Sequence, residues 1–235
     1  MAIGIGMHVQ DPSDDSMNLA MSEAGRPLYD AVKAFVTADV EPLTEEFFRL
    51  GEDRADRWSW APGQLELLDG LKAKARQKGL WNFFLPDDET GQGLSNLDYA
   101  YIAAELGRSR LASESLNCSA PDTGNMEVLE RVGTPEQKEQ WLEPLLNGEI
   151  RSCFGMTEPG LASSDAKNIA TQAVLDGDEW VINGEKYYIS GAGDPRCKVM
   201  ICMVQTNPDA PPHRRQSQIL VPMDTPGAVS YTHLR

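Results

Sequence analysis

The spacing of apolar residues changes once along the chain, near Gly148, and this change most constrains the fold. Before Gly148, apolar residues recur every three to four positions, as they do on one face of a helix. After it, they alternate in short runs, as they do on half-buried strands. We therefore predict an α+β protein, with an N-terminal all-helical domain followed by a small, incomplete antiparallel β-barrel domain.

Capping and breaking residues place the helices of the first half. Helices are expected from about residue 27, over 62–78, over 95–106, over 111–132 and from 134 to just before 148. Pro42 should end or kink the first helix, and Ser95 is a typical N-cap for the third. Pro121 and Gly124 should interrupt the fourth. Thr134 is followed three residues later by a glutamine, which is the pattern of a capping box.

Turn residues place the strands of the second half. Strands are expected over 153–156, 170–176, 180–182, 199–204 and 218–221, with a further strand end over 186–191. Gly177-Asp178 predicts a turn between two of these strands. Asn183-Gly184 is the strongest hairpin signal in the sequence, because both residues tolerate positive φ.

These patterns divide the chain into four parts. We expect a flexible lead-in over residues 1–24, the helical domain over 25–150 and the β domain over 151–229. Residues 230–235 fit neither pattern, and we interpret them as a foreign or mispredicted tail.

Composition excludes several classes of partner. The net charge of −15 argues against binding to nucleic acid or to an anionic membrane, since both require clustered Lys and Arg. No apolar stretch is long enough for a membrane span, and no secretory leader is visible, so we expect a cytoplasmic protein. The four cysteines and three histidines show no metal-binding spacing, and no metal site is predicted.

A first candidate site follows the apolar run 153–156. The run ends in Thr157-Glu158-Pro159-Gly160, which predicts a turn, and then enters a loop of small hydroxylated residues. A strand that delivers backbone groups and a hydroxyl into such a loop can present hydrogen-bonding groups to a planar, phosphate-bearing ligand. A strand edge closed by a simple turn remains open as an alternative for this stretch alone.

A second candidate segment lies at residues 186–191, Lys-Tyr-Tyr-Ile-Ser-Gly. Residues two apart on a strand face the same side. The ring of Tyr188 and the hydroxyl of Ser190 are therefore expected on one surface, with Tyr187 pointing away from it. A strand of this kind can also be ordinary core packing.

Together the two segments resemble a known family. The patterns F-G-M-T-E-P-x-x-A-S-S-D and W-x-I-N-G-x-K-x-Y-I-S-G are similar, in order and spacing, to the two flavin-contacting segments of the acyl-CoA dehydrogenases. The resemblance extends from about the first helix to Pro226. The segment from Asn117 to Met126, N-C-S-A-P-D-T-G-N-M, places the chain nearest to one branch of that family.

The resemblance implies FAD as cofactor and assigns contacts in the first segment. Backbone groups of Phe154, Met156 and Thr157 would contact the flavin ring, and the Thr157 hydroxyl would donate at its polar edge. A donor there would stabilise the negative charge that develops as the ring accepts a hydride. Ser164 would contact the flavin phosphates and the acyl-CoA, with Ser163 as the alternative.

In the second segment, the resemblance places Tyr188 against the flavin ring and Ser190 beside the hydride-accepting nitrogen, with Ile189 between them. Relatives often carry Trp and Thr at the two outer positions. Tyr and Ser keep an aromatic face and a hydroxyl, so the roles are preserved. The loop also departs from the family's T-E-P-x-x-G-S-D pattern, because it has one extra residue and carries Ala162 where Gly is usual.

The implied reaction is the α,β-dehydrogenation of an acyl-CoA thioester to a trans-2-enoyl-CoA, as in fatty acid β-oxidation. Relatives pass the electrons to an electron-transferring flavoprotein and form homo-oligomers. Their catalytic Glu lies in a C-terminal helical domain that we do not find after Gly227. We therefore expect a truncated and inactive chain without a catalytic base of its own, and assign that role to neither Glu158 nor Asp165.

Two other functions remain open. The chain could be a noncatalytic module that binds acyl-CoA or a protein partner while retaining the scaffold. A flavin-dependent acyl-CoA oxidase would differ only in whether oxygen reaches the reduced ring. Acyl chain length cannot be inferred from the sequence.

Overall fold

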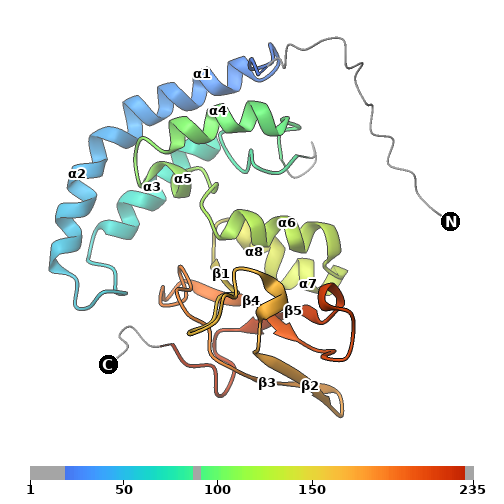
Figure 1. Ribbon diagram of the computed structural model, residues 1–235. Helices are drawn as coiled ribbons and strands as arrows, with labels where there is room; N and C mark the ends of the chain where they lie inside the picture. Colours follow the sequence, from blue (N-terminus) through green and yellow to red (C-terminus); the bar gives the residue numbers. More distant parts are fainter. Residues whose placement is uncertain (1–18, 87–90, 231–235) are drawn as a thin grey trace, which may run out of the picture.

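A computed structural model describes residues 19–86 and 91–230. The first half is helical, and the second half forms a curled mixed sheet beneath the helices (Figure 1). The predicted α+β class and the order of its parts are therefore confirmed. Residues 231–235 of the expected tail and most of the predicted lead-in lie outside the described residues. Of that lead-in, Ser22 is described, and its backbone amide and hydroxyl donate to the Asp98 carboxylate at 2.7 and 2.9 Å.

The helices follow the predicted boundaries closely. They are α1 Arg26–Phe35, α2 Glu41–Leu50, α3 Gln64–Gln77, α4 Asn96–Leu106, α5 Ala112–Ser115, α6 Asp122–Val132, α7 Pro135–Gln137 and α8 Glu143–Leu146. Two π-helical segments, η1 Val36–Val40 and η3 Lys138–Leu142, and three short 3₁₀ segments, η2 Gly51–Asp53, η4 Ala166–Asn168 and η5 Pro212–Arg214, complete the set. None of the helices in the described ranges combines the length and the apolar character needed to cross a bilayer.

The predicted caps and breaks account for these boundaries. The Ser95 hydroxyl accepts from the Asp98 amide at 3.1 Å, and both hydrogen bonds of the Thr134 capping box form. Pro42 lies in the first turn of α2, after the π-helical segment η1, so the helical path continues through it. Pro121 separates α5 from α6 as expected, whereas Gly124 lies inside α6 and the predicted interruption there is wrong.

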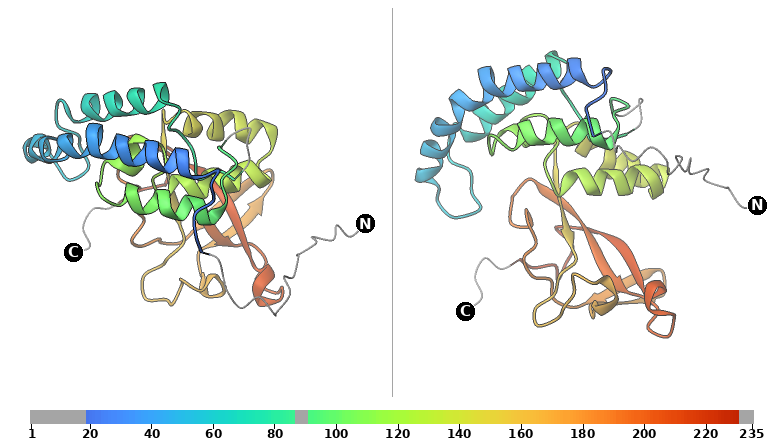
Figure 2. Two further views of the ribbon diagram at one scale, coloured as in Figure 1. Left: turned by 90° about the horizontal axis from the view of Figure 1, so that it is seen from above. Right: turned by 45° about the horizontal axis from the view of Figure 1, so that its top comes forward.

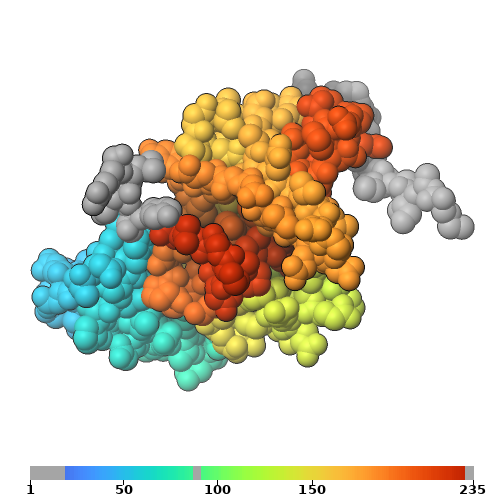
Figure 3. All heavy atoms as spheres, turned by 90° about the horizontal axis from the view of Figure 1, so that it is seen from below, coloured from blue at the N-terminus to red at the C-terminus, as the bar shows by residue number. Residues whose placement is uncertain are grey.

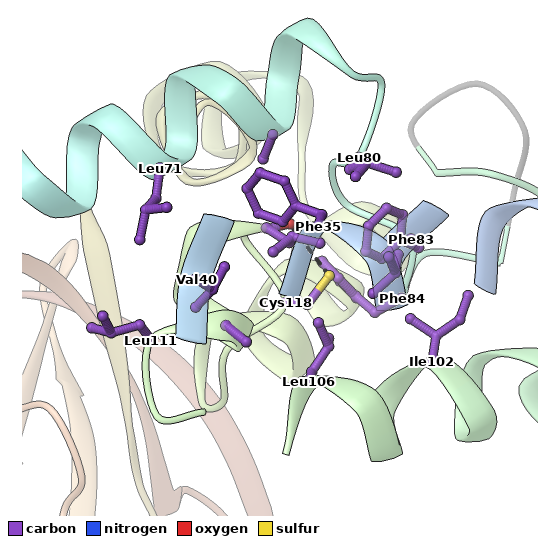
Figure 4. Packing of buried hydrophobic residues seen from close by; sticks show 14 of the residues in the cluster. Phe35, Val40, Leu71, Leu80, Phe83, Phe84, Ile102, Leu106, Leu111 and Cys118 are labelled. Carbon is purple, nitrogen blue, oxygen red and sulfur yellow. Dashed lines mark hydrogen bonds between the residues drawn. The ribbon is translucent and has the colours of Figure 1, made fainter. Parts of the chain in front are cut away.

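The main core lies among the helices and in the segment that joins α3 to α4. Figure 4 shows Phe35 of α1 near the centre of this core, with Leu71 of α3 on one side and Ile102 of α4 on the other. Phe83, from the segment between α3 and α4, lies between Phe35 and Ile102 in the same view. All four side chains are fully or almost fully buried. The core extends to Val199 of the sheet, so helices and sheet share it.

The sheet has the order β1-β4-β2-β3, with β5 on β4. Its strands are β1 Arg151–Gly155, β2 Gln172–Asp176, β3 Glu179–Asn183, β4 Cys197–Gln205 and β5 Gln216–Pro222. The β4 strand pairs in parallel with β1 and β2, while β2–β3 and β4–β5 are antiparallel. The predicted all-antiparallel sheet is therefore wrong. Alternation of apolar residues has the same period in both kinds of ladder, so it does not set strand direction.

One predicted hairpin forms and the other does not. Gly177 has a φ of 63° and turns β2 into β3, as predicted. No strand begins directly after Asn183-Gly184, because residues 184–196 are not in a strand, so the hairpin expected there is wrong. Gly184 has a different role, because a Cβ on it would lie 2.3 Å from the Thr171 hydroxyl oxygen. Glycine is needed here for close approach and not for a turn.

An ionic cluster joins the helices to the sheet. Glu114 of α5 pairs with Arg151 of β1 at 2.6 Å and with Arg196, which precedes β4, at 2.5 Å. Lys72 of α3 lies 3.2 Å from the same carboxylate, and Asp122 of α6 also pairs with Arg151. The cluster thus fixes the start of β1 relative to three helices. The right-hand view of Figure 2 shows β1, in yellow, leading from the helices into the sheet.

Candidate functional site

The first candidate segment begins in β1 and continues past its end. Phe154 is half-buried and pairs with Ile201 of β4, while Met156 and Thr157 follow the strand and remain half-buried. The predicted strand is therefore confirmed, with its last residue at Gly155. Seen from below, the segments of the second half, coloured yellow to red, form the centre and upper part of the view, and the helical half, blue to green, forms its left and lower parts (Figure 3).

The second candidate segment lies directly beside the first. The Tyr187 amide donates to the Thr157 carbonyl oxygen at 2.7 Å, and the Thr157 hydroxyl donates to the Tyr187 carbonyl oxygen at 2.5 Å. Further along, a Cβ on Gly191 would lie 3.4 Å from the Ser152 carbonyl oxygen. The two segments therefore run antiparallel to one another. We name the contact between Thr157 and Tyr187 the segment junction.

Residues 186–191 do not form the predicted strand end. Tyr188 has a left-handed backbone with a φ of 58°, and Gly191 also has a positive φ. Left-handed residues interrupt the pleat, so the rule that alternate residues share a face does not apply. Tyr187 does not point away from Tyr188 either, because their ring centroids are 3.9 Å apart. The ring of Tyr188 is nevertheless 83% exposed, Ser190 is exposed and Ile189 is half-buried.

The two loop serines have different environments. Ser163 is 1% exposed, and its hydroxyl accepts from the Glu158 amide at 2.6 Å. This serine therefore closes the turn after β1. Ser164 is exposed, and its hydroxyl has no hydrogen-bond partner among the described residues. Of the two, only Ser164 presents its hydroxyl to a ligand.

A buried ion pair next to the segment junction was not predicted from the sequence. The Lys186 ammonium lies 2.7 Å from the Glu158 carboxylate, which also accepts from the amides of Ala170 and Thr171 at 2.7 and 2.9 Å. Burial raises the pKa of Glu158, but these hydrogen bonds outweigh it and lower the pKa to about 2. The only sequence signal for the pair is that its members belong to the two motifs, T-E-P and G-x-K.

Of the predicted site residues, Ser164, Tyr188 and Ser190 are exposed. Tyr188 offers an aromatic face, and the hydroxyls of Ser164 and Ser190 donate to no group among the described residues. The Thr157 hydroxyl, predicted as the donor at the polar edge, donates to Tyr187. The Thr157 amide has no acceptor in the described part of the chain. The Thr157 amide, and not its hydroxyl, is therefore left as a donor without an acceptor among the described residues.

Comparisons with known proteins identify the family of the chain. The sequence models of the acyl-CoA dehydrogenase N-terminal domain and middle domain match residues 22–149 and 153–234. The chain is 50% identical over 212 residues to acyl-CoA dehydrogenase family member 10 of Mus musculus, covering 88% of this chain and 19% of that protein. It is 56% identical over 162 residues to the probable acyl-CoA dehydrogenase FadE2 of Mycobacterium tuberculosis, covering 68% of this chain and 39% of that protein.

Solved structures give the same result. A putative acyl-CoA dehydrogenase from Mycobacterium abscessus superposes with a TM-score of 0.80 at 52% identity, over 88% of this chain and 52% of that one. A glutaryl-CoA dehydrogenase from Mycobacterium smegmatis, solved in complex with FADH2, gives 0.64 at 25% identity, over 91% of this chain and 48% of that one. The chain belongs to the acyl-CoA dehydrogenase family. It spans about a fifth to two fifths of the length of the two curated relatives above.

Proposed function

We propose that the chain forms the helical and middle parts of a flavin-dependent enzyme that oxidises an acyl-CoA thioester to a trans-2-enoyl-CoA. The observation that supports this most directly is the segment junction, where Thr157 and Tyr187 hold the two motif segments side by side. A family member of similar fold has been solved with a reduced flavin, which favours the same cofactor here.

FAD, when bound, would supply the hydride acceptor. The backbone of Phe154, Met156 and Thr157 would line one side of the flavin ring, with the Thr157 amide donating at its polar edge. Tyr188 to Ser190, with Ile189 between them, would line the other side. Ser164 would donate to a phosphate of the flavin or of the acyl-CoA, because its hydroxyl is exposed. Ser163 would keep the loop closed.

The general base is expected to come from another part of the longer protein. Glu158 is held by Lys186 and by two amides, and a carboxylate with a pKa of about 2 is a poor base near neutral pH. Asp165 accepts from the Lys167 amide at 3.1 Å and pairs with its ammonium at 3.1 Å. Both carboxylates therefore have structural roles. An electron-transferring flavoprotein as electron acceptor and a homo-oligomeric assembly complete the proposal.

Titration of the purified chain with FAD, followed by flavin fluorescence, tests the cofactor. We expect saturable binding with a change in the flavin spectrum, and no bleaching of the bound flavin by acyl-CoAs. The full-length protein should bleach with an acyl-CoA and turn over with an artificial electron acceptor. Saturable binding of acyl-CoA without any binding of FAD by either protein would contradict the proposal and would favour a noncatalytic module.

A further inference from the structure

The ion pair of Glu158 and Lys186 connects three separate segments of the chain. Glu158 belongs to the turn after β1, and its carboxylate accepts from the amides of Ala170 and Thr171 just before β2. Lys186 belongs to the second motif segment, and its ammonium donates to the Glu158 carboxylate at 2.7 Å. The same ammonium donates to the Met156 carbonyl oxygen at 3.1 Å.

Both side chains are buried. The Glu158 side chain is 4% exposed and the Lys186 side chain 9% exposed. Their hydrogen-bonding groups are directed at one another and at main-chain atoms, so the pair offers little capacity for binding a ligand itself. A buried ion pair adds little to net stability, because the cost of removing both charges from water offsets their attraction. Our hypothesis is that this pair serves to hold the three segments in one arrangement.

The pair is continuous with the segment junction. Met156, Thr157 and Glu158 are consecutive, and each bonds either Lys186 or its neighbour Tyr187. Loss of the ammonium would remove the donor to Met156 and leave the Glu158 carboxylate buried without a counter-charge. The turn after β1 and the second segment would then no longer be held in this register.

We propose that Lys186, through its pair with Glu158, is a positioning residue of the flavin site. It holds the main chain of Met156 and Thr157 against the Tyr187–Ser190 segment, so that one ligand can contact both. This inference rests on the proposed flavin function. The Lys186 ammonium contacts the Glu158 carboxylate and the Met156 carbonyl oxygen, so its effect is exerted through the geometry of the segment junction.

A matched pair of variants tests the inference. Lys186→Met removes the ammonium at the site. Lys72→Met removes an equally buried ammonium, 9% exposed and 3.2 Å from Glu114, in the cluster at the start of β1. We expect Lys186→Met to weaken FAD binding by about tenfold or more, as measured by flavin fluorescence, and Lys72→Met to change it by less than about twofold. Lys186→Arg, which keeps the cation, should recover part of the affinity.

Hydrogen exchange of the Tyr187 amide supplies a readout that needs no flavin. This amide donates to Thr157, and we expect Lys186→Met to accelerate its exchange while Lys72→Met leaves it unchanged. If Lys186→Met does not fold, Glu158→Gln serves instead, because it removes the charge that faces Lys186 and keeps one of the two oxygen acceptors.

The outcomes separate the two proposals. Failure of the unmodified chain and of the full-length protein to bind FAD refutes the flavin function, whereas the exchange rate still decides whether Lys186 holds the segment junction. Equal FAD affinity in Lys186→Met and the unmodified chain, or equal protection of the Tyr187 amide, overturns the positioning role.

Discussion

Glu114→Gln is the substitution for which the structure makes the strongest statement about stability. The Glu114 carboxylate is paired with Arg151, Arg196 and Lys72, and it joins α5 to the start of β1. Burial raises the pKa of Glu114, but the three cations outweigh it and lower the pKa from 4.5 to about 2. Each pKa unit corresponds to about 1.4 kcal/mol, so the ionised carboxylate contributes about 3 kcal/mol at neutral pH.

An independent estimate agrees with this magnitude. Removal of one partner from a buried ion pair typically costs about 3–5 kcal/mol, because the remaining charges stay buried without compensation. Arg151 and Arg196 each keep a second carboxylate, Asp122 and Asp194, which places the expected loss at the lower end of that range. We therefore expect Glu114→Gln to lower the free energy of unfolding by about 3 kcal/mol.

Equilibrium unfolding in urea, followed by circular dichroism and tryptophan fluorescence, measures this loss. Because the pKa of Glu114 is lowered in the native state, its contribution is complete above about pH 4.5 and is lost as the pH falls toward 2. The difference between the unmodified chain and Glu114→Gln should shrink over that range. Glu130→Gln is the control. Its carboxylate lies 3.8 Å from the Lys138 ammonium and its side chain is 35% exposed, so the substitution should cost no more than about 0.5 kcal/mol. A loss below about 1 kcal/mol for Glu114→Gln at neutral pH would refute the reasoning.

Four further substitutions test the fold by the same unfolding assay. Gly184→Ala should destabilise the chain by about 1–3 kcal/mol, since its Cβ would lie 2.3 Å from the Thr171 hydroxyl oxygen. Gly124→Ala should stabilise α6 by about 0.5–1 kcal/mol, because alanine favours a helix over glycine and the space around this position is open. No loss in the first, or a loss in the second, would contradict these contacts. Phe83→Ala should cost about 3–5 kcal/mol, because the ring is fully buried and its removal leaves a cavity; a cost near zero would place the ring outside the core. Thr134→Ala should cost about 1 kcal/mol through loss of the capping box, and an unchanged midpoint would show that the cap is dispensable.

The helical half follows from local signals. Ser95 and Thr134 cap helices because their hydroxyls accept nearby amides, and such contacts depend only on residues a few positions away. The turn at Gly177 is local in the same sense. Helical structure continues past Pro42 and Gly124, and nearby residues do not predict this. Packing against the surrounding helices decides whether a helix continues past a residue of low helix propensity.

The candidate site was predicted only in part, for a comparable reason. Which segments carry the site follows from the two motifs, and the structure places Thr157 beside Tyr187. The left-handed backbone of Tyr188 could not be predicted from the motifs, because no residue type in this segment indicates a positive φ at a tyrosine. The pair of Glu158 and Lys186 spans 28 positions in the sequence, and its geometry depends on how the chain returns to β1.

A crystal structure of the chain with FAD tests the central claim most directly. We predict that the flavin ring packs against Tyr188, with the main chain of Met156 and Thr157 along its polar edge and the ion pair of Glu158 and Lys186 intact behind them. A flavin bound elsewhere on the chain, or a structure in which Thr157 and Tyr187 are separated, would contradict the account.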